Sequence, residues 1–360
     1  MTLTAIVAAS MIMIACGNSN AEKAQSEQPQ QQQYVPQQEQ DTTAADSTAA
    51  VRDGSDIGGS QAGVAGPKSV ATSASSAPSK AVPISSKQFK DSKKKALLIG
   101  VGTYQYREDW DKTLSSARDV ELLAGSLGQA GYEVTTLIDH QATHDGIEKA
   151  FKELLKNCNA GDVVLIHFSG HGQQIKGGQQ RNESDNLTET FVAYDARKEY
   201  RAGGYDGKRH FTDDEIDNYA TLLRERLGKK GMLLLSFDTC HSGTMSRDAV
   251  ETKKGDVWRS VDMPITIPNY KPVAQATARG ALAPGIELSA CQAGQLNFEY
   301  IIENKQNKSD AGNRYGSLSY MIYLALGDGK TEPRAIADYV MKNYKTKKVM
   351  TRQQPCVYNM

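Results

Sequence analysis

Two short glycine-containing motifs supply a histidine and a cysteine that could act together on a carbonyl group. The first motif is Phe168-Ser-Gly-His-Gly172, and the second is Asp238-Thr-Cys-His-Ser-Gly243. A thiol paired with an imidazole suits acyl transfer, because the imidazole takes the thiol proton and later returns it to the leaving amine. Cys240 is therefore the candidate nucleophile, and His171 is the candidate base and acid.

The residues around this pair could stabilise a tetrahedral intermediate. Fixed backbone N–H donors stabilise an oxyanion, and the N–H groups of Gly172 and Cys240 are the candidates. Asp238 lies two residues before Cys240, so alternation along an extended strand puts both side chains on one face. Together with a second carboxylate near the scissile bond, Asp238 would favour substrates with basic side chains and disfavour acidic ones.

Each motif follows an apolar run, residues 162–167 before the first and residues 231–237 before the second. Continuous runs of this kind are typical of parallel strands buried on both faces. Open α/β sheets bind ligands just beyond the carboxyl ends of their strands. The sequence therefore predicts that both motifs lie at the same edge of one sheet.

The remaining hydrophobic pattern alternates between strand and helix periods. Further strands are expected at residues 95–101, 133–138, 190–194 and 286–290, and helices at 114–127, 143–157, 212–227, 317–326 and 333–343. Thr212-Asp-Asp-Glu215 is a capping box that opens one of these helices. This alternation predicts an α/β fold, a three-layer α/β/α sandwich with a mostly parallel six-stranded sheet.

The N-terminal region has a different character. An apolar stretch too short to span a membrane leads into Met13-Ile-Ala-Cys-Gly17, which resembles a bacterial lipobox. We expect a lipoprotein signal peptide over residues 1–16 with Cys16 as the lipidated residue, a plain apolar tail being the alternative. Residues 17–92 are rich in Gln, Ser and Ala and are expected to form a disordered tether, followed by a folded domain over 93–360.

Composition narrows the classes of partner. The formal net charge is zero, and no basic stripe accompanies aromatic residues, so nucleic acid is not an expected partner. The five cysteines show neither a CxxC pair nor metal-ligand spacing, which predicts no disulfide framework. Cys158 and Cys291 are expected to be inert core thiols.

The two motifs resemble the catalytic motifs of the metacaspases and their bacterial caspase-like relatives. The resemblance covers about residues 93–358. It includes Ala96-Leu-Leu-Ile-Gly-Val-Gly-Thr-Tyr104, Leu114-Ser-Ser-Ala-Arg-Asp-Val120, Thr212-Asp-Asp-Glu-Ile216 and Glu287-Leu-Ser-Ala-Cys-Gln-Ala-Gly-Gln295. It implies a caspase-like fold and a cysteine endopeptidase that is made as a zymogen and acts as a monomer.

The resemblance also implies roles for particular residues. Asp119, Ser169 and Asp238 match a pocket for a basic P1 side chain, so that peptides are cut after Arg or Lys. No cofactor is required for the chemistry, but many members use calcium, for which Asp185, Asp213 and Asp214 are candidate ligands. The last two also suit a helix N-terminus.

Members of this group often cut themselves after the cysteine strand. Lys254 is our candidate for such self-processing, and Arg259 and Arg279 are further basic positions in the same irregular stretch. A solvated charged loop is the plain alternative for this region.

Together these observations predict a lipid-anchored peptidase of the bacterial cell envelope, periplasmic or surface-exposed. Its expected partners are the membrane, through the anchor, and proteins or peptides with basic P1 residues. Two alternatives remain open. One is a catalytically silent caspase-fold module that binds or scaffolds, and the other is a cysteine amidase of different specificity.

Overall fold

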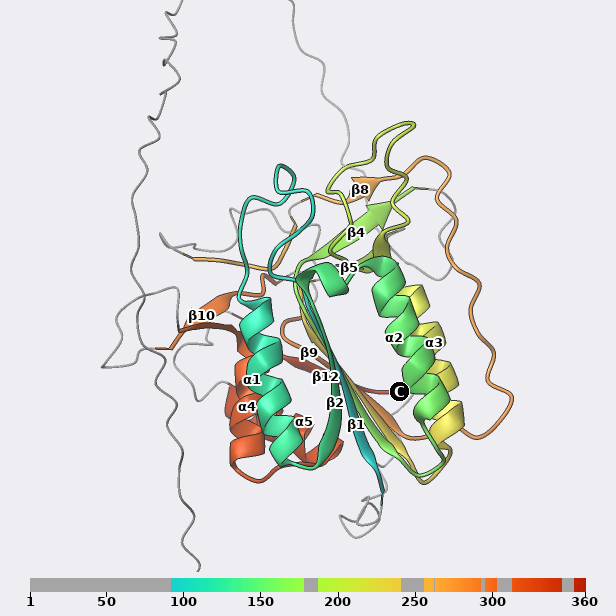
Figure 1. Ribbon diagram of the computed structural model, residues 1–360, viewed down its shortest axis with the longest axis vertical. Coiled ribbons are helices and arrows are strands. Elements are labelled where there is room, and N and C mark those ends of the chain that lie inside the picture. Colours follow the sequence, from blue (N-terminus) through green and yellow to red (C-terminus); the bar gives the residue numbers. More distant parts are fainter. Residues whose placement is uncertain are drawn as a thin grey trace, which may run out of the picture. The chain divides into compact units, whose positions relative to one another are not determined.

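The computed structural model describes residues 92–177, 187–240, 256–261, 263–292, 295–302, 313–344 and 353–360. The predicted signal peptide with Cys16, and the tether up to residue 91, lie outside this part of the chain. Within the described residues, strands and helices form three layers, as the alternating pattern predicts (Figure 1). None of the described helices is both long and apolar enough to cross a membrane.

The middle layer is a six-stranded sheet. In the order in which they pair, its strands are β12 (Cys356–Asn359), β9 (Gly285–Ser289), β7 (Met232–Asp238), β3 (Val163–Ser169), β1 (Lys94–Gly100) and β2 (Tyr132–Ile138). The pairs are parallel except that of β12 with β9. The prediction of a mostly parallel sheet in an α/β sandwich is thus confirmed.

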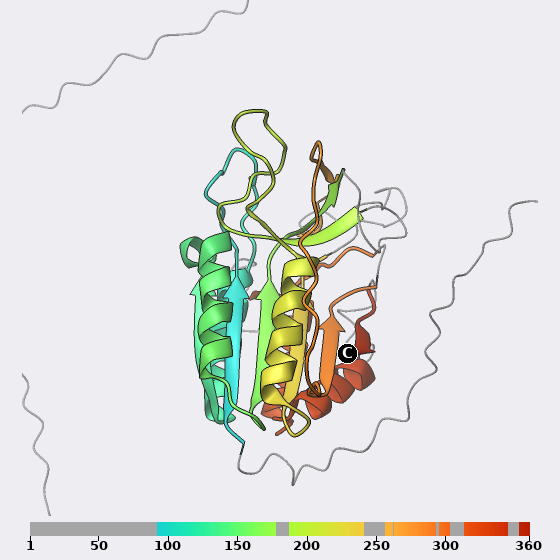
Figure 2. The ribbon, with the colours of Figure 1, turned by 90° about the vertical axis from the view of Figure 1, so that its right-hand side faces the viewer.

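Helices cover both faces of this sheet. On one face lie α1 (Ser116–Gln129), α4 (Ser317–Gly327) and α5 (Pro333–Asn343); on the other lie α2 (His144–Asn157) and α3 (Asp213–Leu227), in front in Figure 2. Local sequence sets where several of them begin. The Thr143 hydroxyl accepts from the Gly146 N–H, and the predicted capping box of Thr212 and Glu215 opens α3. A short 3₁₀ helix, Asp139–Gln141, links β2 to α2.

The strand expected at residues 190–194 is not part of the main sheet, which corrects that prediction. It is β5 (Leu187–Val192), and it pairs antiparallel with β4 (Gly172–Lys176), which follows His171 directly. With β6 (His210–Thr212) and β8 (Ile265–Thr266) they form a second sheet above the carboxyl ends of the main strands (Figure 1). β10 (Glu299–Ile301) and β11 (Arg314–Gly316) form a separate pair.

The hydrophobic core has two parts, one on each face of the main sheet. Along β3, Val164 and Phe168 pack on the α2 and α3 side, whereas Val163 and Leu165 pack on the side of α1, α4 and α5. Successive strand residues point to opposite faces, so a strand covered on both faces must be apolar at consecutive positions. This explains the continuous hydrophobic runs in the sequence.

The register of β3 against β7 aligns the two chemical motifs. Ser169 pairs with Asp238 as the last residues of the two parallel strands. His171 and Cys240 each lie two residues beyond that pair. The sheet therefore delivers both to one edge at the same height.

His167 is a polar residue within the buried part of β3. Its Nδ1 lies 2.9 Å from the Ser236 hydroxyl of β7, and its Nε2 lies 3.0 Å from the Ser319 hydroxyl of α4. Burial lowers the pKa of His167 to about 4, so the ring is uncharged at neutral pH. It links two neighbouring strands to the helix that covers them.

This burial predicts how stability depends on pH. An imidazole in the unfolded chain has a pKa of about 6.5. Below that pH, His167 is therefore protonated in the unfolded chain but stays neutral in the folded one. The free energy of unfolding should therefore fall as pH falls from 6.5 towards 4. His167→Gln should reduce that slope by up to about 1.4 kcal/mol per pH unit. Urea titrations across this range measure it, with the exposed His140→Gln as the control; an unchanged slope in His167→Gln would contradict the prediction.

Candidate active site

His171 lies in the turn between β3 and β4, against two aromatic rings. Its imidazole stacks on Tyr104 and Trp110 with ring centroids 5.6 and 5.4 Å away, and its backbone N–H donates to the Tyr104 hydroxyl. Burial lowers the pKa of His171 to about 4, against an opposing effect of the Arg259 main chain. Its buried Nδ1 has no hydrogen-bond partner among the described residues. The ring is thus fixed, uncharged at neutral pH and able to accept a proton.

Cys240 follows β7 and is buried, with its thiol donating to the Gln295 carbonyl at 2.9 Å. A Cβ on Gly172 would overlap the carbonyl oxygen of Cys240, so only glycine allows the two turns to pack this closely. The structure therefore brings the histidine motif and the cysteine motif into direct contact. His241 to Gly243 lie outside the described residues.

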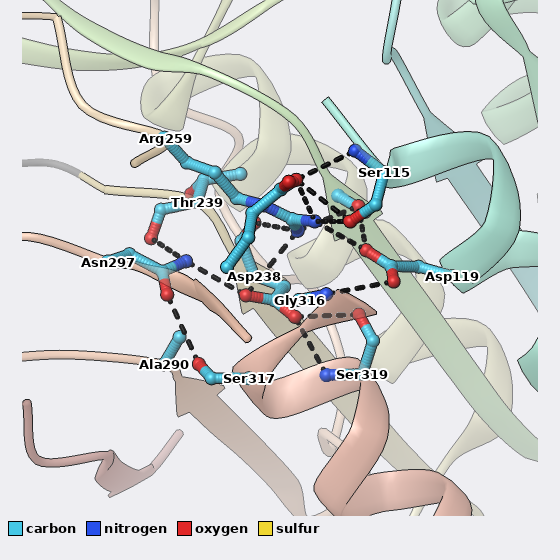
Figure 3. Close-up of polar contacts among 12 residues, drawn as sticks. Ser115, Asp119, Asp238, Thr239, Arg259, Ala290, Asn297, Gly316, Ser317 and Ser319 are labelled. Atoms are coloured by element: carbon cyan, nitrogen blue, oxygen red, sulfur yellow. Dashed lines mark hydrogen bonds and ion pairs between the residues drawn. The ribbon is translucent and has the colours of Figure 1, made fainter. Parts of the chain in front are cut away.

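The side chain of Arg259 occupies the space beside these turns and is fully buried (Figure 3). It enters from the segment that follows Cys240 in sequence and meets residues from both α1 and β10. Its hydrogen-bond acceptors are the Asp119 carboxylate (2.6 Å), the Glu299 carboxylate (2.9 Å), the Ser169 and Ser115 hydroxyls (2.9 and 3.2 Å) and the Asp238 carbonyl (2.9 Å). All three guanidinium nitrogens take part, since Nε also faces Glu299 at 3.3 Å.

The charges in this cluster depend on one another. Burial raises the pKa of Asp119 to about 6, with Arg259 opposing and the other two carboxylates adding to the rise. Burial alone would also raise the pKa of Asp238, but Arg259 and hydrogen bonds from Asn297 and Ser319 hold it below its usual value. Burial lowers the pKa of Arg259, and attraction to the carboxylates more than reverses this, so the guanidinium stays charged.

Hydrogen bonds hold the carboxylates in place. Asp238 accepts from the Asn297 amide at 2.8 Å and from the Ser319 backbone N–H at 2.7 Å, while the Gly316 N–H donates to Asp119 at 2.9 Å (Figure 3). A Cβ on Gly316 would overlap both the Asp238 carboxylate and the guanidinium of Arg259. A bare backbone therefore forms one wall of this pocket.

The main chain of Arg259 is held as firmly as its side chain. The Gly172 N–H donates to the Arg259 carbonyl oxygen at 3.1 Å. Residues 257–259 run antiparallel to residues 297–299, with the Arg259 N–H donating to the Asn297 carbonyl at 2.9 Å and the Glu299 N–H to the Val257 carbonyl at 2.8 Å. The candidate oxyanion donor Gly172 thus already faces a peptide carbonyl.

The structure brings Asp119, Ser169 and Asp238 together, as the sequence predicts, but around the chain's own arginine. Asp213 and Asp214 lie in the first turn of α3. Among the described segments, no group of three or more His, Cys, Asp or Glu residues that could hold a metal ion is found. Asp185 and Lys254 lie outside the described residues.

Cys291 lies close to the candidate nucleophile. Its thiol lies 3.5 Å from the Gln295 carbonyl, the same acceptor that Cys240 uses. A hydrogen bond with Cys240, and then burial, raises the pKa of Cys291, which keeps it protonated. Cys158, Cys240, Cys291 and Cys356 are free thiols.

The sequence does not predict that Ser115 and Glu299 belong to the pocket. Ser115 donates to Glu299 through both its backbone N–H and its hydroxyl, at 2.7 and 2.8 Å. Glu299 lies between Phe298 and Tyr300, and a lone acid among apolar residues was the available signal. Sequence spacing alone could not join these residues, because 184 positions separate them.

Comparison with known proteins agrees with this geometry. A model of the caspase domain matches residues 93–360. Metacaspase-1 of Mycosarcoma maydis is 30% identical over 172 residues, covering 46% of this chain and 40% of that protein. Metacaspase-2 of Trypanosoma brucei brucei is 31% identical over 163 residues, covering 42% of each. The chain thus spans about two fifths of the length of these relatives.

A solved structure, that of protein GSU0716 from Geobacter sulfurreducens, shares the fold. Its TM-score is 0.51 at 20% sequence identity, covering 74% of this chain and 93% of that one. The resemblance to metacaspases predicted from the motifs is confirmed by the relatives above. Because the domain model covers well over half of the sequence, the chain belongs to the caspase-domain family.

Proposed function

We propose that this protein is a cysteine endopeptidase that cleaves peptide bonds after Arg or Lys. One observation carries the proposal. A fully buried arginine side chain lies among three carboxylates while its own carbonyl oxygen accepts a hydrogen bond from Gly172, next to Cys240 and His171. A basic side chain and the carbonyl that follows it are thus accommodated together at the candidate catalytic residues.

The proposed mechanism assigns a role to each group at this edge of the sheet. His171 is uncharged at neutral pH and accepts the thiol proton of Cys240. The sulfur attacks the substrate carbonyl, and the Gly172 N–H stabilises the oxygen as it gains negative charge. Tyr104 and Trp110 hold the imidazole in place. His171 then protonates the leaving amine, and water hydrolyses the thioester that remains on Cys240, which restores the thiol.

The pocket supports selection by charge and by shape. Three carboxylates in the pocket stabilise a cationic side chain of the substrate and repel an acidic one. A guanidinium uses Nε, Nη1 and Nη2 here, whereas a lysine ammonium is a single compact charge. We therefore expect arginine to be preferred over lysine at P1.

Other parts of the proposal concern the whole chain. We propose a lipid anchor at Cys16 that holds residues 93–360 at the bacterial cell envelope through a tether, and a monomeric enzyme that processes itself after the cysteine strand. The proposed chemistry requires no cofactor. Calcium, with Asp185, Asp213 and Asp214 as its candidate ligands, is proposed only as a regulator.

Peptide hydrolysis by the purified full chain tests the reaction. Fluorogenic peptides with Arg at P1 should be cleaved about tenfold faster than peptides with Lys at P1. This ratio should be the same in calcium and in chelator. Peptides with Asp at P1 should not be cleaved. Cys240→Ala should lose at least about a thousandfold in kcat/KM. Cys158→Ala removes a different buried thiol and should retain activity. A folded protein that cleaves none of these peptides would instead favour a silent binding module.

The pocket is tested by Asp119→Asn, which keeps the size of the side chain and removes its charge. The loss of a buried charge-assisted hydrogen bond should lower kcat/KM for Arg peptides by roughly tenfold to a hundredfold. Asp145→Asn, an exposed acid in the first turn of α2, is the matched control and should have little effect. Equal losses in both variants would show that the Asp119 carboxylate does not bind the P1 side chain.

A further inference from the structure

We infer that the bond between Arg259 and Ser260 is the bond that this site cleaves in its own chain, and that residues 257–259 block the site until it is cut. The inference rests on the proposed peptidase function, and it names a processing bond other than the one after Lys254. The structure carries it through the placement of the Arg259 side chain, its main chain and its carbonyl group.

The main chain of residues 257–259 is bound as an extended peptide. It adds alongside residues 297–299 through two backbone hydrogen bonds, with Trp258 opposite Phe298 in an antiparallel bridge. Addition of a strand to an open edge is a general mode of peptide recognition, in which backbone bonds supply affinity and side-chain pockets supply specificity. The register is fixed here, because the charged pocket accepts the residue at position 259.

The carbonyl of Arg259 lies where cleavage requires it. The Gly172 N–H donates to its oxygen at 3.1 Å, and Gly172 directly follows His171 in the chain. Ser260 continues past Gly172 in an isolated parallel bridge and is buried. The bond that follows the pocket residue therefore passes directly beside the catalytic groups.

Arg279, a further basic position in the same stretch, lacks these features. Arg279 is exposed, and its backbone N–H donates to Glu225 on α3, away from the pocket. Lys254 lies outside the described residues. Only one basic side chain can occupy the pocket at a time, and in this structure that side chain is Arg259.

The cleavage balances with water as the co-reactant. The Cys240 sulfur bonds to the Arg259 carbonyl carbon and its proton passes to His171. The bond to the Ser260 nitrogen then breaks, and His171 gives that nitrogen the proton. Water attacks the resulting thioester and loses a proton to His171, which returns one to the sulfur as the carbon–sulfur bond breaks. The products are a carboxylate at Arg259 and an amine at Ser260.

The same contacts exclude other substrates before cleavage. The guanidinium fills the pocket, and residues 257–259 cover the strand edge at 297–299. An external peptide substrate would have to bind in the same pocket and along the same strand edge. Before cleavage, the chain is continuous on both sides of Arg259. After cleavage, Arg259 is a new C-terminus that can dissociate from the pocket. The full chain should therefore show a lag in hydrolysis of an Arg peptide.

Intact-mass analysis and N-terminal sequencing of the full chain over time test the inference. The wild type should be cut into two fragments, one ending at Arg259 and one beginning at Ser260, at a rate independent of protein concentration, and Cys240→Ala should stay whole. Arg259→Lys keeps the cation and should be cut at the same bond about tenfold more slowly. Arg259→Ala should not be cut there and, when folded, should hydrolyse an Arg peptide without a lag. Arg279→Ala is the control and should behave as wild type.

The outcomes separate this inference from the proposed function. New N-termini at residue 255 or 280, with none at Ser260, would overturn the inference and leave the peptidase intact. So would a chain that stays whole while it hydrolyses Arg peptides. A chain that cuts neither itself nor any peptide would remove the proposed function instead. Should Arg259→Ala fail to fold, Arg259→Lys and the position of the new terminus decide the matter.

Discussion

The structure around the candidate site depends on one buried cation. Asp119 comes from α1, Asp238 from the end of β7 and Glu299 from β10, and none could remain charged in the interior without compensation. The Arg259 guanidinium satisfies all three, within 2.6 to 3.5 Å. Removing one partner of such a cluster costs far more than a surface ion pair is worth. Arg259 is thereby fixed to three separate elements, α1, β7 and β10.

The parallel sheet supplies the complementary constraint. Its register places Ser169 opposite Asp238, so one ladder of backbone hydrogen bonds sets the height of both motifs. His167, bonded to Ser236 and Ser319, holds β3, β7 and α4 together just below that edge. The positions of the residues at this edge therefore depend on core packing several residues away. Open α/β sheets generally place their binding sites at this edge.

Much of this arrangement follows from local sequence. The apolar runs of β3 and β7, the capping box at Thr212 and the apolar face of α2 specify their elements without reference to the rest of the chain. The prediction that the strand at residues 190–194 belongs to the main sheet is wrong, because β propensity does not indicate which sheet a strand joins. β12 is four residues long at an edge and has no period to detect.

In the pocket, too, some residues can be predicted from local sequence and others cannot. Asp119, Ser169 and Asp238 could be proposed because they lie in or near recognisable motifs. Glu299 and Ser115 meet only in the folded chain, and nothing local indicates that Arg259 would turn inward to them. Long-range electrostatic satisfaction of this kind is a property of the tertiary structure, which spacing along the sequence does not encode.

The raised pKa of Asp119 has a consequence for how the pocket binds cations. With the guanidinium present, that carboxyl titrates at about 6, and without a neighbouring cation its proton would be held more tightly still. An empty pocket therefore takes up a proton, and an arriving basic side chain displaces it. Binding of cations and release of protons are linked, so the affinity of the vacated pocket for basic ligands falls as the surroundings become more acidic.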